Sequence, residues 1–297
     1  MHQPPRMETA SDIQHKYDQV RDYCGYFFLE DQTLIAANGN DTFDFLQTQT
    51  TNDVHQLTSG SGQNSAIVDR KGKLISSFSL HKSSENSVLF LVETGQKQNL
   101  KQHLETFIFR EEIKIKETIP QNTILTIQGP KSSLLLEKCD PTIKLPSKPN
   151  DLTFWHWSNT DLIIINKSLA GEEGFIIALP HSLKNNLESL LIDKGEPFSL
   201  TFIGPETREI LRIEAGIPKF GQDMDKTFVL PETGLDHTSV SYSKGCYIGQ
   251  EVIARIKTYG APVQALMGLV IEEYERPPFN GEIRFQKQKI GTIKSSC

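Results

Sequence analysis

Residues 244–260 read KGCYIGQEVIARIKTYG, with one cysteine between two glycines and a helical pattern directly after it. Three apolar residues follow at the i, i+1 and i+4 spacing of one helix face: Val252, Ile253 and Ile256. Gly260, with Pro262 two residues beyond it, is a typical stop signal for a helix. The stretch therefore predicts a helix from Gly249 onward, with Cys246 just ahead of its first turn.

Cys246 has the sequence surroundings of a reactive thiol. The positive end of the helix and the ammonium of Lys244 would both favour the thiolate form of its sulfur. Gly245 and Gly249 have no Cβ, so the backbone can fold closely around the sulfur. A lone cysteine in a soluble protein is more often a small buried apolar residue, and this alternative stays open.

The eight residues from Lys244 to Glu251, Lys-Gly-Cys-Tyr-Ile-Gly-Gln-Glu, resemble the signature of the YgfZ family of folate-binding proteins implicated in iron–sulfur protein maturation. Further segments that resemble this family are residues 39–54, residues 66–78 and residues 212–221 with Pro231-Glu232. The resemblance implies a cyclic three-part arrangement around a central folate pocket. The glycine-cleavage T-protein, an aminomethyltransferase, shares this fold.

The composition suits a soluble globular protein. The chain has 297 residues, of which 37% are hydrophobic and 23% are charged. Its net charge of −6 does not favour a broad nucleic-acid surface, so we expect no direct nucleic-acid binding. No apolar run approaches the ~20 residues of a membrane span, and the start lacks the apolar segment of a secretory signal. We expect a cytoplasmic protein without a membrane partner.

The cysteines do not form a metal motif. There are four, and they lie far apart: Cys24, Cys139, Cys246 and Cys297. None forms a Cys-x-x-Cys pair, so the spacing predicts neither a zinc nor an iron–sulfur site. A disulfide framework is not expected at this density, and we predict reduced thiols.

Apolar periodicity predicts an α+β protein of duplicated strand–helix units. The resemblance implies that these units form a T-protein-like folate-binding fold around a central cleft. The expected parts are a polar leader over residues 1–20 with a short helix over 11–20, a first α+β subdomain over 21–120, a second over 121–262 with the cysteine motif, and a short C-terminal β domain over 263–297. The pattern Leu-Lys-x-x-Leu-Glu occurs at residues 100–105 and again at 183–188, which indicates an internal duplication.

The C-terminal domain is expected to be small and open. Strand patterns cover residues 266–271, 281–286 and 288–294. Three strands cannot close a barrel, so an open sheet edge should remain. Members of the family that this chain resembles usually carry further strands here, so this domain is expected to be truncated.

Residues 212–218, Arg-Ile-Glu-Ala-Gly-Ile-Pro, are the second informative stretch. A carboxylate at the end of a helix can accept two hydrogen bonds from a flat heterocycle such as a pterin. In the T-protein the Glu of this segment holds the pterin, so the resemblance implies that Glu214 contacts folate, with tetrahydrofolate or a derivative as the cofactor. Asn52, Asp53 and Arg255 are further pocket candidates. The alternative is a surface glutamate paired with a neighbouring arginine, and Asp223 and Asp225 are expected to be solvated.

One departure separates this chain from the T-protein. The relative carries a paired Asp-Asp in its central hairpin, one of which is the catalytic acid–base, whereas this chain has Ser76 and Ser77 at that place. A serine hydroxyl cannot act as a carboxylate base near neutral pH. Whether the chain is an enzyme stays open, but we do not expect a T-protein-type aminomethyltransferase.

The resemblance implies a folate-binding accessory protein for the assembly or repair of iron–sulfur proteins, including radical enzymes that modify tRNA. Folate would lie in the central cleft, with Cys246 near its rim as the functional thiol. Lys244 would tune this thiol, while Gln250 and Glu251 would position the thiol or its partner. The expected partners are folate and iron–sulfur client proteins or assembly factors. Two alternatives remain open: a tetrahydrofolate-dependent one-carbon transferase, and a non-catalytic scaffold whose cysteine is buried.

Overall fold

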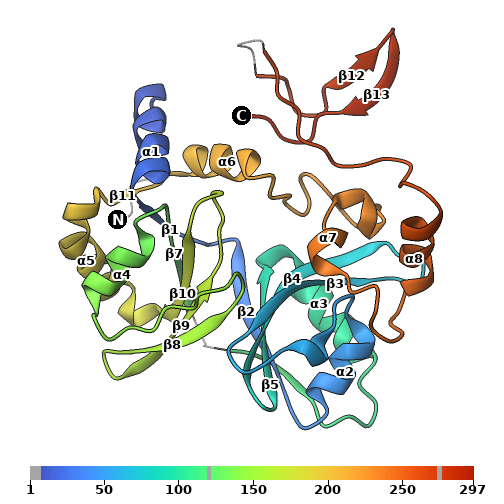
Figure 1. Cartoon of the computed structure of the whole chain (residues 1–297), viewed down its shortest axis with the longest axis horizontal. Coiled ribbons are helices and arrows are strands. Elements are labelled where there is room, and N and C mark those ends of the chain that lie inside the picture. Colours follow the sequence, from blue (N-terminus) through green and yellow to red (C-terminus); the bar gives the residue numbers. More distant parts are fainter. Residues whose placement is uncertain (1–7, 119–121, 273–275) are drawn as a thin grey trace.

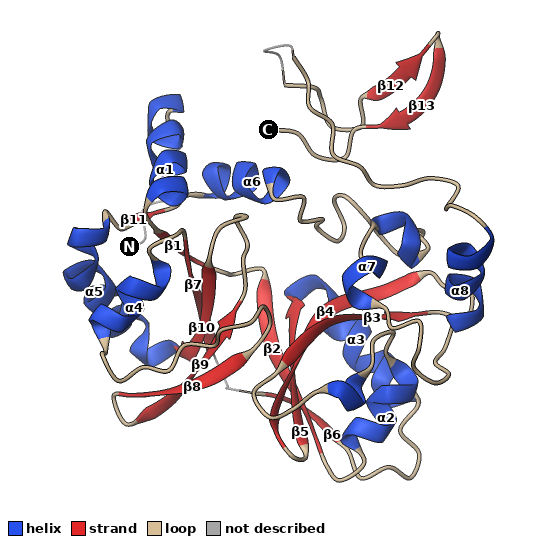
Figure 2. Ribbon diagram, in the orientation of Figure 1, coloured by secondary structure: helices blue, strands red, loops and turns tan. Residues whose placement is uncertain are grey.

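The computed structural model describes residues 8–118, 122–272 and 276–297 (Figures 1 and 2). The first residues of the expected leader, and the expected boundary at residues 120 and 121, lie outside this description. Two sheets stand next to each other, and a small hairpin projects from the end of the chain (Figure 1). None of the helices in the described residues has the length and apolar character that a membrane crossing requires.

The first half of the chain builds a five-stranded antiparallel sheet. Its strands, in the spatial order β3-β4-β5-β2-β6, are β2 (Gln32–Asn38), β3 (Gly62–Val68), β4 (Leu74–Ser84), β5 (Ser87–Glu93) and β6 (Lys114–Glu117). Its outer face is covered by α2 (Thr42–Gln49), the short helix η1 (Val54–Gln56) and α3 (Thr94–Thr106). Leu46 and Leu100 on these helices pack against Leu80 and Phe90 of the sheet, which buries one face of each strand.

The second sheet has six strands, of which β1 comes from the start of the chain and the other five from its second half. Its strands, in the spatial order β11-β1-β7-β10-β9-β8, are β1 (Gly25–Phe28), β7 (Asn122–Gln128), β8 (Leu152–Trp157), β9 (Thr160–Asn166), β10 (Gly174–Pro180) and β11 (Thr201–Phe202). Only the β1–β11 pair is parallel among the described pairs. Helices flank it: α4 (Ser132–Cys139), η2 (His181–Leu183), α5 (Lys184–Gly195) and η3 (Glu196–Phe198).

The two halves repeat one order of elements. The chain runs β2-α2-β3-β4-β5-α3-β6 and then β7-α4-β8-β9-β10-α5-β11. The spatial orders match as well, except that β1 is inserted between β7 and β11 of the second sheet. The two Leu-Lys-x-x-Leu-Glu matches fall on α3 and at the start of α5, and the predicted α+β fold of duplicated units is confirmed.

One apolar cluster joins the inner faces of the two sheets. Its members include Leu34, Ala36, Leu89 and Leu91 of the first sheet and Ile163, Ile165, Ile176 and Ala178 of the second. Side chains alternate along a strand, so the strands that pack outward against helices also supply this inner layer. Each buried leucine or isoleucine contributes about 1.5–3 kcal/mol, and the cluster therefore holds the two halves together.

Two helices lie side by side at one end of the second sheet: α1 (Ala10–Asp22) and α6 (Pro205–Glu214) (Figure 1). Thr9 caps α1 through a capping box with Asp12, which satisfies two backbone N–H groups at the helix start. The predicted helix over residues 11–20 is confirmed and is longer than predicted. This part of the expected leader is a structural element that packs on α6.

The segment after α6 covers one end of the first sheet. It contains η4 (Leu230–Thr233), α7 (Asp236–Ser239) and α8 (Gln250–Tyr259). Leu230, Tyr247 and Ile253 of this segment pack on Val68 and Leu74. The helix predicted from Gly249 is confirmed, with Gly249 and Gly260 as its caps.

The end of the chain forms a hairpin of two strands, β12 (Glu282–Phe285) and β13 (Gln288–Thr292). The prediction of a third strand over residues 266–271 is wrong, because this segment has no regular secondary structure and pairs with no strand in the described residues. Its side chains include the exposed Met267, Leu269 and Val270. An apolar run becomes a strand only where a neighbour completes its backbone hydrogen bonds.

Candidate functional site

The cysteine loop presents Cys246 to solvent between two anchored residues. Cys246 is exposed, whereas Lys244 and Tyr247 are each only 8% exposed. Tyr247 packs with Val68 and Ile253 in the cluster beneath the loop. The chain on both sides of the sulfur is therefore fixed, and the alternative of a buried cysteine is wrong.

Lys244 anchors the loop to the end of α2. Its ammonium donates to the carbonyl oxygens of Gln47 (2.6 Å), Thr50 (2.7 Å) and Asn52 (2.9 Å). The last carbonyls of a helix lack partners and carry partial negative charge, so a cation is favourable there. All three N–H groups of the ammonium are used, and none is left to donate to the sulfur of Cys246. The ammonium therefore positions the loop, and its predicted effect on the thiol stays a prediction.

Asn52 and Asp53, the predicted pocket residues, lie beside this ammonium. The side-chain nitrogen Nδ2 of Asn52 donates to the backbone carbonyl of Asn64 on β3 at 2.8 Å. A carboxylate oxygen of Asp53 accepts from the amide of Gln47 at 2.9 Å. Burial lowers the pKa of Lys244 to about 8, and the charge of Asp53 opposes that shift. The structure brings Lys244, Asn52 and Asp53 together in one anchor.

The two glycines of the motif have different roles. Gly249 has a φ of +82°, and a Cβ added there would lie 2.3 Å from the carbonyl oxygen of Asp69 in the turn after β3. Gly245 has nothing within 4 Å of such a Cβ. Only Gly249 is required by the backbone, because it lets the chain enter α8 against that turn.

The first turns of α8 carry the other predicted residues near the sulfur. Gln250 opens the helix and is half-buried, while Glu251 and Arg255 are exposed. Glu251 also complements the positive end of the helix. The side chains of these three residues form no hydrogen bond or ion pair with other described residues, so they are accessible to a partner that meets Cys246.

Glu214, the predicted folate contact, ends α6 and is held by α1. Its Oε2 accepts from the hydroxyl of Tyr17 at 2.8 Å and from the guanidinium of Arg21 at 2.7 Å. Its Oε1 has no partner in the described residues, and the side chain is 39% exposed. The alternative to a folate contact was a surface glutamate paired with a neighbouring arginine. Glu214 does pair with an arginine, but this is Arg21 of α1 and not an arginine of α6.

A path of polar contacts leads from Glu214 to the cysteine loop. Arg21 also contacts the loop after β9, and this loop reaches β3 through Lys167. The contacts are Glu214–Arg21 (2.7 Å), Arg21–Ala170 O (2.7 Å), Lys167–Asn64 Oδ1 (3.2 Å), Asn52 Nδ2–Asn64 O (2.8 Å) and Lys244–Asn52 O (2.9 Å). The predicted folate contacts and the cysteine loop are thus linked, although Glu214 and Cys246 do not touch.

β4 carries the two serines that stand in place of a carboxylate pair. Ser76 is buried and its hydroxyl has no partner in the described residues. Ser77 pairs with Ala66 across the sheet, and its N–H donates to Gln96 at 3.0 Å. The residues of β4, LISSFSLHKSS, include no carboxylate. This strand offers no acid–base group of the T-protein kind.

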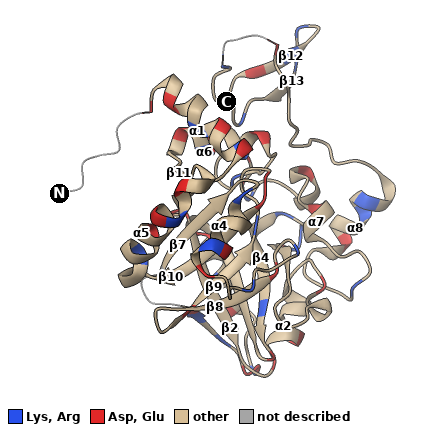
Figure 3. Ribbon diagram, turned by 60° about the vertical axis from the view of Figure 1, so that its left-hand side comes forward, with Lys and Arg blue, Asp and Glu red and all other residues tan. Residues whose placement is uncertain are grey.

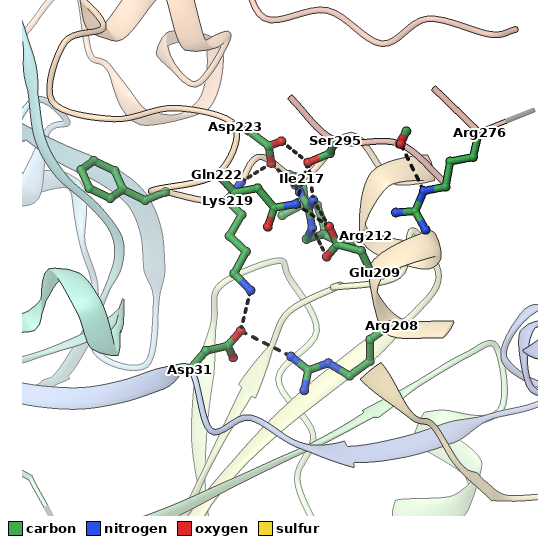
Figure 4. A network of polar contacts seen from close by, with 12 residues as sticks. Asp31, Arg208, Glu209, Arg212, Ile217, Lys219, Gln222, Asp223, Arg276 and Ser295 are labelled. Carbon is green, nitrogen blue, oxygen red and sulfur yellow. Dashed lines mark hydrogen bonds and ion pairs between the residues drawn. The ribbon is translucent and has the colours of Figure 1, made fainter. Parts of the chain in front are cut away.

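A network of ion pairs lies where α6 ends (Figure 4). Arg212 is at its centre and pairs with Glu209 at 2.6 Å and with Asp223 at 2.7 Å. Asp223 also accepts from the hydroxyl of Ser295 and is 4% exposed. The prediction that Asp223 is solvated is wrong, because a shielded guanidinium needs carboxylates around it. Asp225 stays partly exposed.

Two pockets on the described surface have volumes of about 290 and 330 Å³. The first lies beside the Arg212 network and is lined by Gln222, Arg276, Pro277, Pro278, Phe279, Lys294, Ser295 and Ser296. The second is lined by residues of α2 with Asp41, Phe107 and Glu111. Neither pocket is lined by Glu214, Asn52, Asp53 or Cys246.

Acidic and basic residues are interspersed along both halves of the chain (Figure 3).

Sequence reasoning missed the residues that support Glu214 and the inner polar cluster: Tyr17, Arg21 and Lys167. Arg21 lies in a polar helix and is typical of a solvated face, and Lys167 follows a strand like many surface lysines. Their partners lie 193 and 103 residues away in the chain for Arg21–Glu214 and Lys167–Asn64. No local signal marks such contacts.

A repeated β-α-β-β-β-α-β unit, with a glutamate at the end of the helix that follows the second repeat, defines a protein of the T-protein-like class. Residues 3–244 match the family described as the GCVT N-terminal domain. The chain belongs to this family.

Individual relatives agree with this assignment. The aminomethyltransferase of Oceanobacillus iheyensis is 28% identical over 298 residues, which cover 96% of this chain and 78% of the relative. That of Bacillus cytotoxicus is 25% identical over 291 residues, with 96% and 78% covered. The solved glycine cleavage system aminomethyltransferase T from Bartonella henselae matches with a TM-score of 0.73 and 21% identity, covering 84% of this chain and 67% of that one. The last likeness concerns the fold alone.

Proposed function

We propose that this protein binds tetrahydrofolate or a derivative and acts through Cys246 as a cytoplasmic accessory factor in the assembly or repair of iron–sulfur proteins, including radical enzymes that modify tRNA. The observation that carries the proposal is the presentation of Cys246. The residue is exposed, while Lys244 and Tyr247 on either side are buried and held. A sulfur fixed in this way can meet a client protein without rearrangement of the loop, and the uninterrupted Lys-Gly-Cys motif supports this role.

Folate binding is supported by membership of the family and by the state of Glu214. Two donors hold one oxygen of its carboxylate and fix the orientation of the group. The other oxygen has no partner in the described residues and is open to an N–H of a pterin. A charge-assisted hydrogen bond of this kind is among the stronger polar contacts, at ~1.5–3 kcal/mol.

The partner surface is proposed to include the start of α8. Gln250, Glu251 and Arg255 lie within three helical turns of the sulfur in sequence, and their side chains form no hydrogen bond or ion pair with other described residues. Client proteins or assembly factors would therefore contact these side chains together with Cys246.

The test is complementation of a strain that lacks this protein, read by the activity of an iron–sulfur enzyme that modifies tRNA. Cys246→Ser is expected to lose the biological role while the purified variant unfolds at the wild-type temperature. Cys297→Ser is the matched control, since Cys297 is also exposed, and it should complement fully. Full complementation by Cys246→Ser would overturn the proposal.

A second candidate is a tetrahydrofolate-dependent one-carbon transferase. It is favoured by the likeness over nearly the whole chain to relatives named aminomethyltransferases. The serines at positions 76 and 77 of β4 argue against it. Release of methylenetetrahydrofolate from an aminomethylated carrier protein, at a rate above that of a Glu214→Ala variant, would make this candidate the better one.

A further inference from the structure

The turn between β3 and β4 lies directly beside the cysteine loop. A Cβ added to Gly249 would lie 2.3 Å from the carbonyl oxygen of Asp69 in this turn. One added to Gly72 in the turn would lie 3.1 Å from the side chain of Val252 on α8. Gly249 is three residues after Cys246, and three residues span at most about 10 Å. The turn and the start of α8 therefore surround the exposed sulfur together.

These two elements carry a group of cations, here called the basic patch: Arg70, Lys71, Lys73, Arg255 and Lys257. All five side chains are exposed except that of Lys73, which is half-buried. Figure 3 shows the basic residues of α8 in blue. None of the five cations forms an ion pair with a carboxylate of the described residues. The patch therefore presents its charge to solvent and not to partners within the chain.

The carboxylates around the cysteine loop do not neutralise this patch. One oxygen of Asp69 accepts from two backbone N–H groups of its own turn, at 2.8 and 2.9 Å. Glu232 and Asp236 are only 9% and 7% exposed. They accept from a backbone N–H at 2.8 Å and from a tyrosine hydroxyl at 3.0 Å. Glu251 is exposed, and it stands against five cations. The surface around the sulfur thus has an excess of positive charge, although the whole chain carries a net charge of −6.

Positive charge gathered around a fixed sulfur favours a negatively charged partner. Like charges that share a small surface repel each other, and carboxylates of a partner relieve this repulsion. An exposed ion pair adds little affinity by itself, but a local excess of charge speeds the encounter and orients the partner.

Two kinds of polyanion fit a positive surface, and the patch favours a protein over a nucleic acid. Glu251 is exposed among the cations and repels phosphate groups, whereas it can pair with a lysine or arginine of a protein. A mixed pattern of this kind, with one carboxylate among several cations, suits a protein surface on which acidic residues predominate.

We propose that the basic patch docks an acidic segment of the client protein and brings this segment to Cys246. The inference rests on the proposed function and adds to it the chemistry of the partner surface. Carboxylates of the partner pair with Arg70, Lys71 and Arg255, while the anchored loop keeps the sulfur fixed beside them.

The test compares how fast the thiol of Cys246 reacts with two short peptides, one rich in glutamate and one rich in lysine. Each peptide carries a single cysteine, activated as its thiopyridine disulfide. The full chain is used with Cys297→Ser, because Cys297 is the other exposed thiol. Release of thiopyridone gives the rate, and mass spectrometry locates the adduct.

The basic patch should make the glutamate peptide react faster. At an ionic strength of about 10 mM its rate should exceed that of the lysine peptide about tenfold or more. The ratio of the two rates should approach one at about 1 M salt, where the screening length falls to about 3 Å.

Variants of the patch test the source of this preference. Arg70→Gln and Arg255→Gln each remove one exposed charge, and together they should lower the rate ratio about threefold or more at low salt. Lys148→Gln, at an exposed position in the loop before β8, is the matched control and should leave the ratio unchanged. Both peptides meet the same thiol, so a change in the intrinsic reactivity of the sulfur cancels in the ratio. Unchanged melting temperatures exclude an effect through folding.

Three results would overturn the inference. The first is equal rates for the two peptides at low salt in wild-type surroundings. The second is a rate ratio that Arg70→Gln and Arg255→Gln leave unchanged. The third comes from competition: if transfer RNA slows the glutamate peptide more strongly than polyglutamate does at equal charge concentration, the patch belongs to a nucleic acid.

The outcomes also separate this inference from the proposed function. If the two peptides react alike while Cys246→Ser fails to complement, the role of the thiol stands and only the acidic partner falls. If Cys246→Ser complements fully while the glutamate peptide is preferred, the proposed function falls and the patch remains a binding site for an acidic polypeptide.

Discussion

At the scale of single residues, the neighbours of Cys246 decide how its sulfur is presented. The sequence predicted a cysteine ahead of a helix, and the structure has the sulfur exposed there. The role of Lys244 was not predictable, because it bonds to carbonyls at the end of α2, about two hundred residues earlier in the chain. Local sequence shows which charge is near a cysteine in the chain, but only the fold decides where that charge points.

The thiols of Cys246 and Cys24 should differ in reactivity towards an alkylating agent. Cys246 is exposed and should react in the native protein. Cys24 is buried, and burial raises the pKa of its thiol to about 12, so it should react only after unfolding. Mass spectrometry of peptides after timed alkylation measures both rates. Equal rates for Cys24 and Cys246 in native protein would contradict this account.

Removal of the loop anchor should cost stability. Lys244→Met leaves three carbonyls at the end of α2 without the ammonium, and the free energy of unfolding should fall by about 2 kcal/mol or more. Lys257→Met, on the exposed side of α8, is the control and should change it by less than about 0.5 kcal/mol. Urea unfolding measures both variants. A loss in Lys244→Met no larger than that of the control would show that the anchor has no energetic role.

At the scale of elements, apolar periodicity predicted an element correctly where the element's own residues form the apolar face by which it packs. The helix from Gly249 and the repeated helices α3 and α5 follow their apolar stripes. The predicted strand over residues 266–271 failed because a strand also needs a partner, and pattern alone does not supply one. The packing of α1 on α6 depends in the same way on residues that are distant in the chain.

The two motif glycines provide a test at this scale. Gly249→Ala should destabilise the protein by about 1–2 kcal/mol from its left-handed backbone alone, with a further loss from contact with the carbonyl of Asp69. Gly245→Ala, where the added Cβ meets open space, should be nearly neutral. Thermal unfolding of the two variants gives the comparison. If both alanine variants behave alike, the tight entry into α8 is not as described.

At the scale of the whole molecule, the two halves are joined by an apolar layer that also contains buried polar groups. The duplication, and with it most of the fold, was predictable because each half carries its own strand and helix patterns. The inner cluster of His81, Lys167, Asn64 and Asn150 was not, because its members come from separate strands and loops of both halves. Sequence reasoning identified the sites whose residues lie in one continuous stretch of the chain. It missed the sites whose residues come from several separate segments.

His81 should make the whole protein sensitive to acid. Its pKa is lowered to about 3 in the folded state against about 6.5 unfolded, so the unfolded chain takes up the proton first as pH falls. The free energy of unfolding should therefore decline between pH 6.5 and pH 3, and this part of the decline should be absent in His81→Gln. His156→Gln, at an exposed position, is the control. Identical slopes for His81→Gln and wild type in urea unfolding across this range would contradict the prediction.

The central claim is that this chain is a folate-binding protein whose pterin contact is Glu214 and whose thiol acts apart from ligand binding. Calorimetric titration with tetrahydrofolate tests it most directly, on wild type, Glu214→Ala, Glu172→Gln and Cys246→Ser. Glu172→Gln removes another carboxylate partner of Arg21 without touching Glu214, so it controls for disturbance of α1. The account predicts one site in wild type, about tenfold or weaker binding in Glu214→Ala and unchanged binding in the other two variants. No heat of binding in wild type, or full affinity in Glu214→Ala, would contradict it.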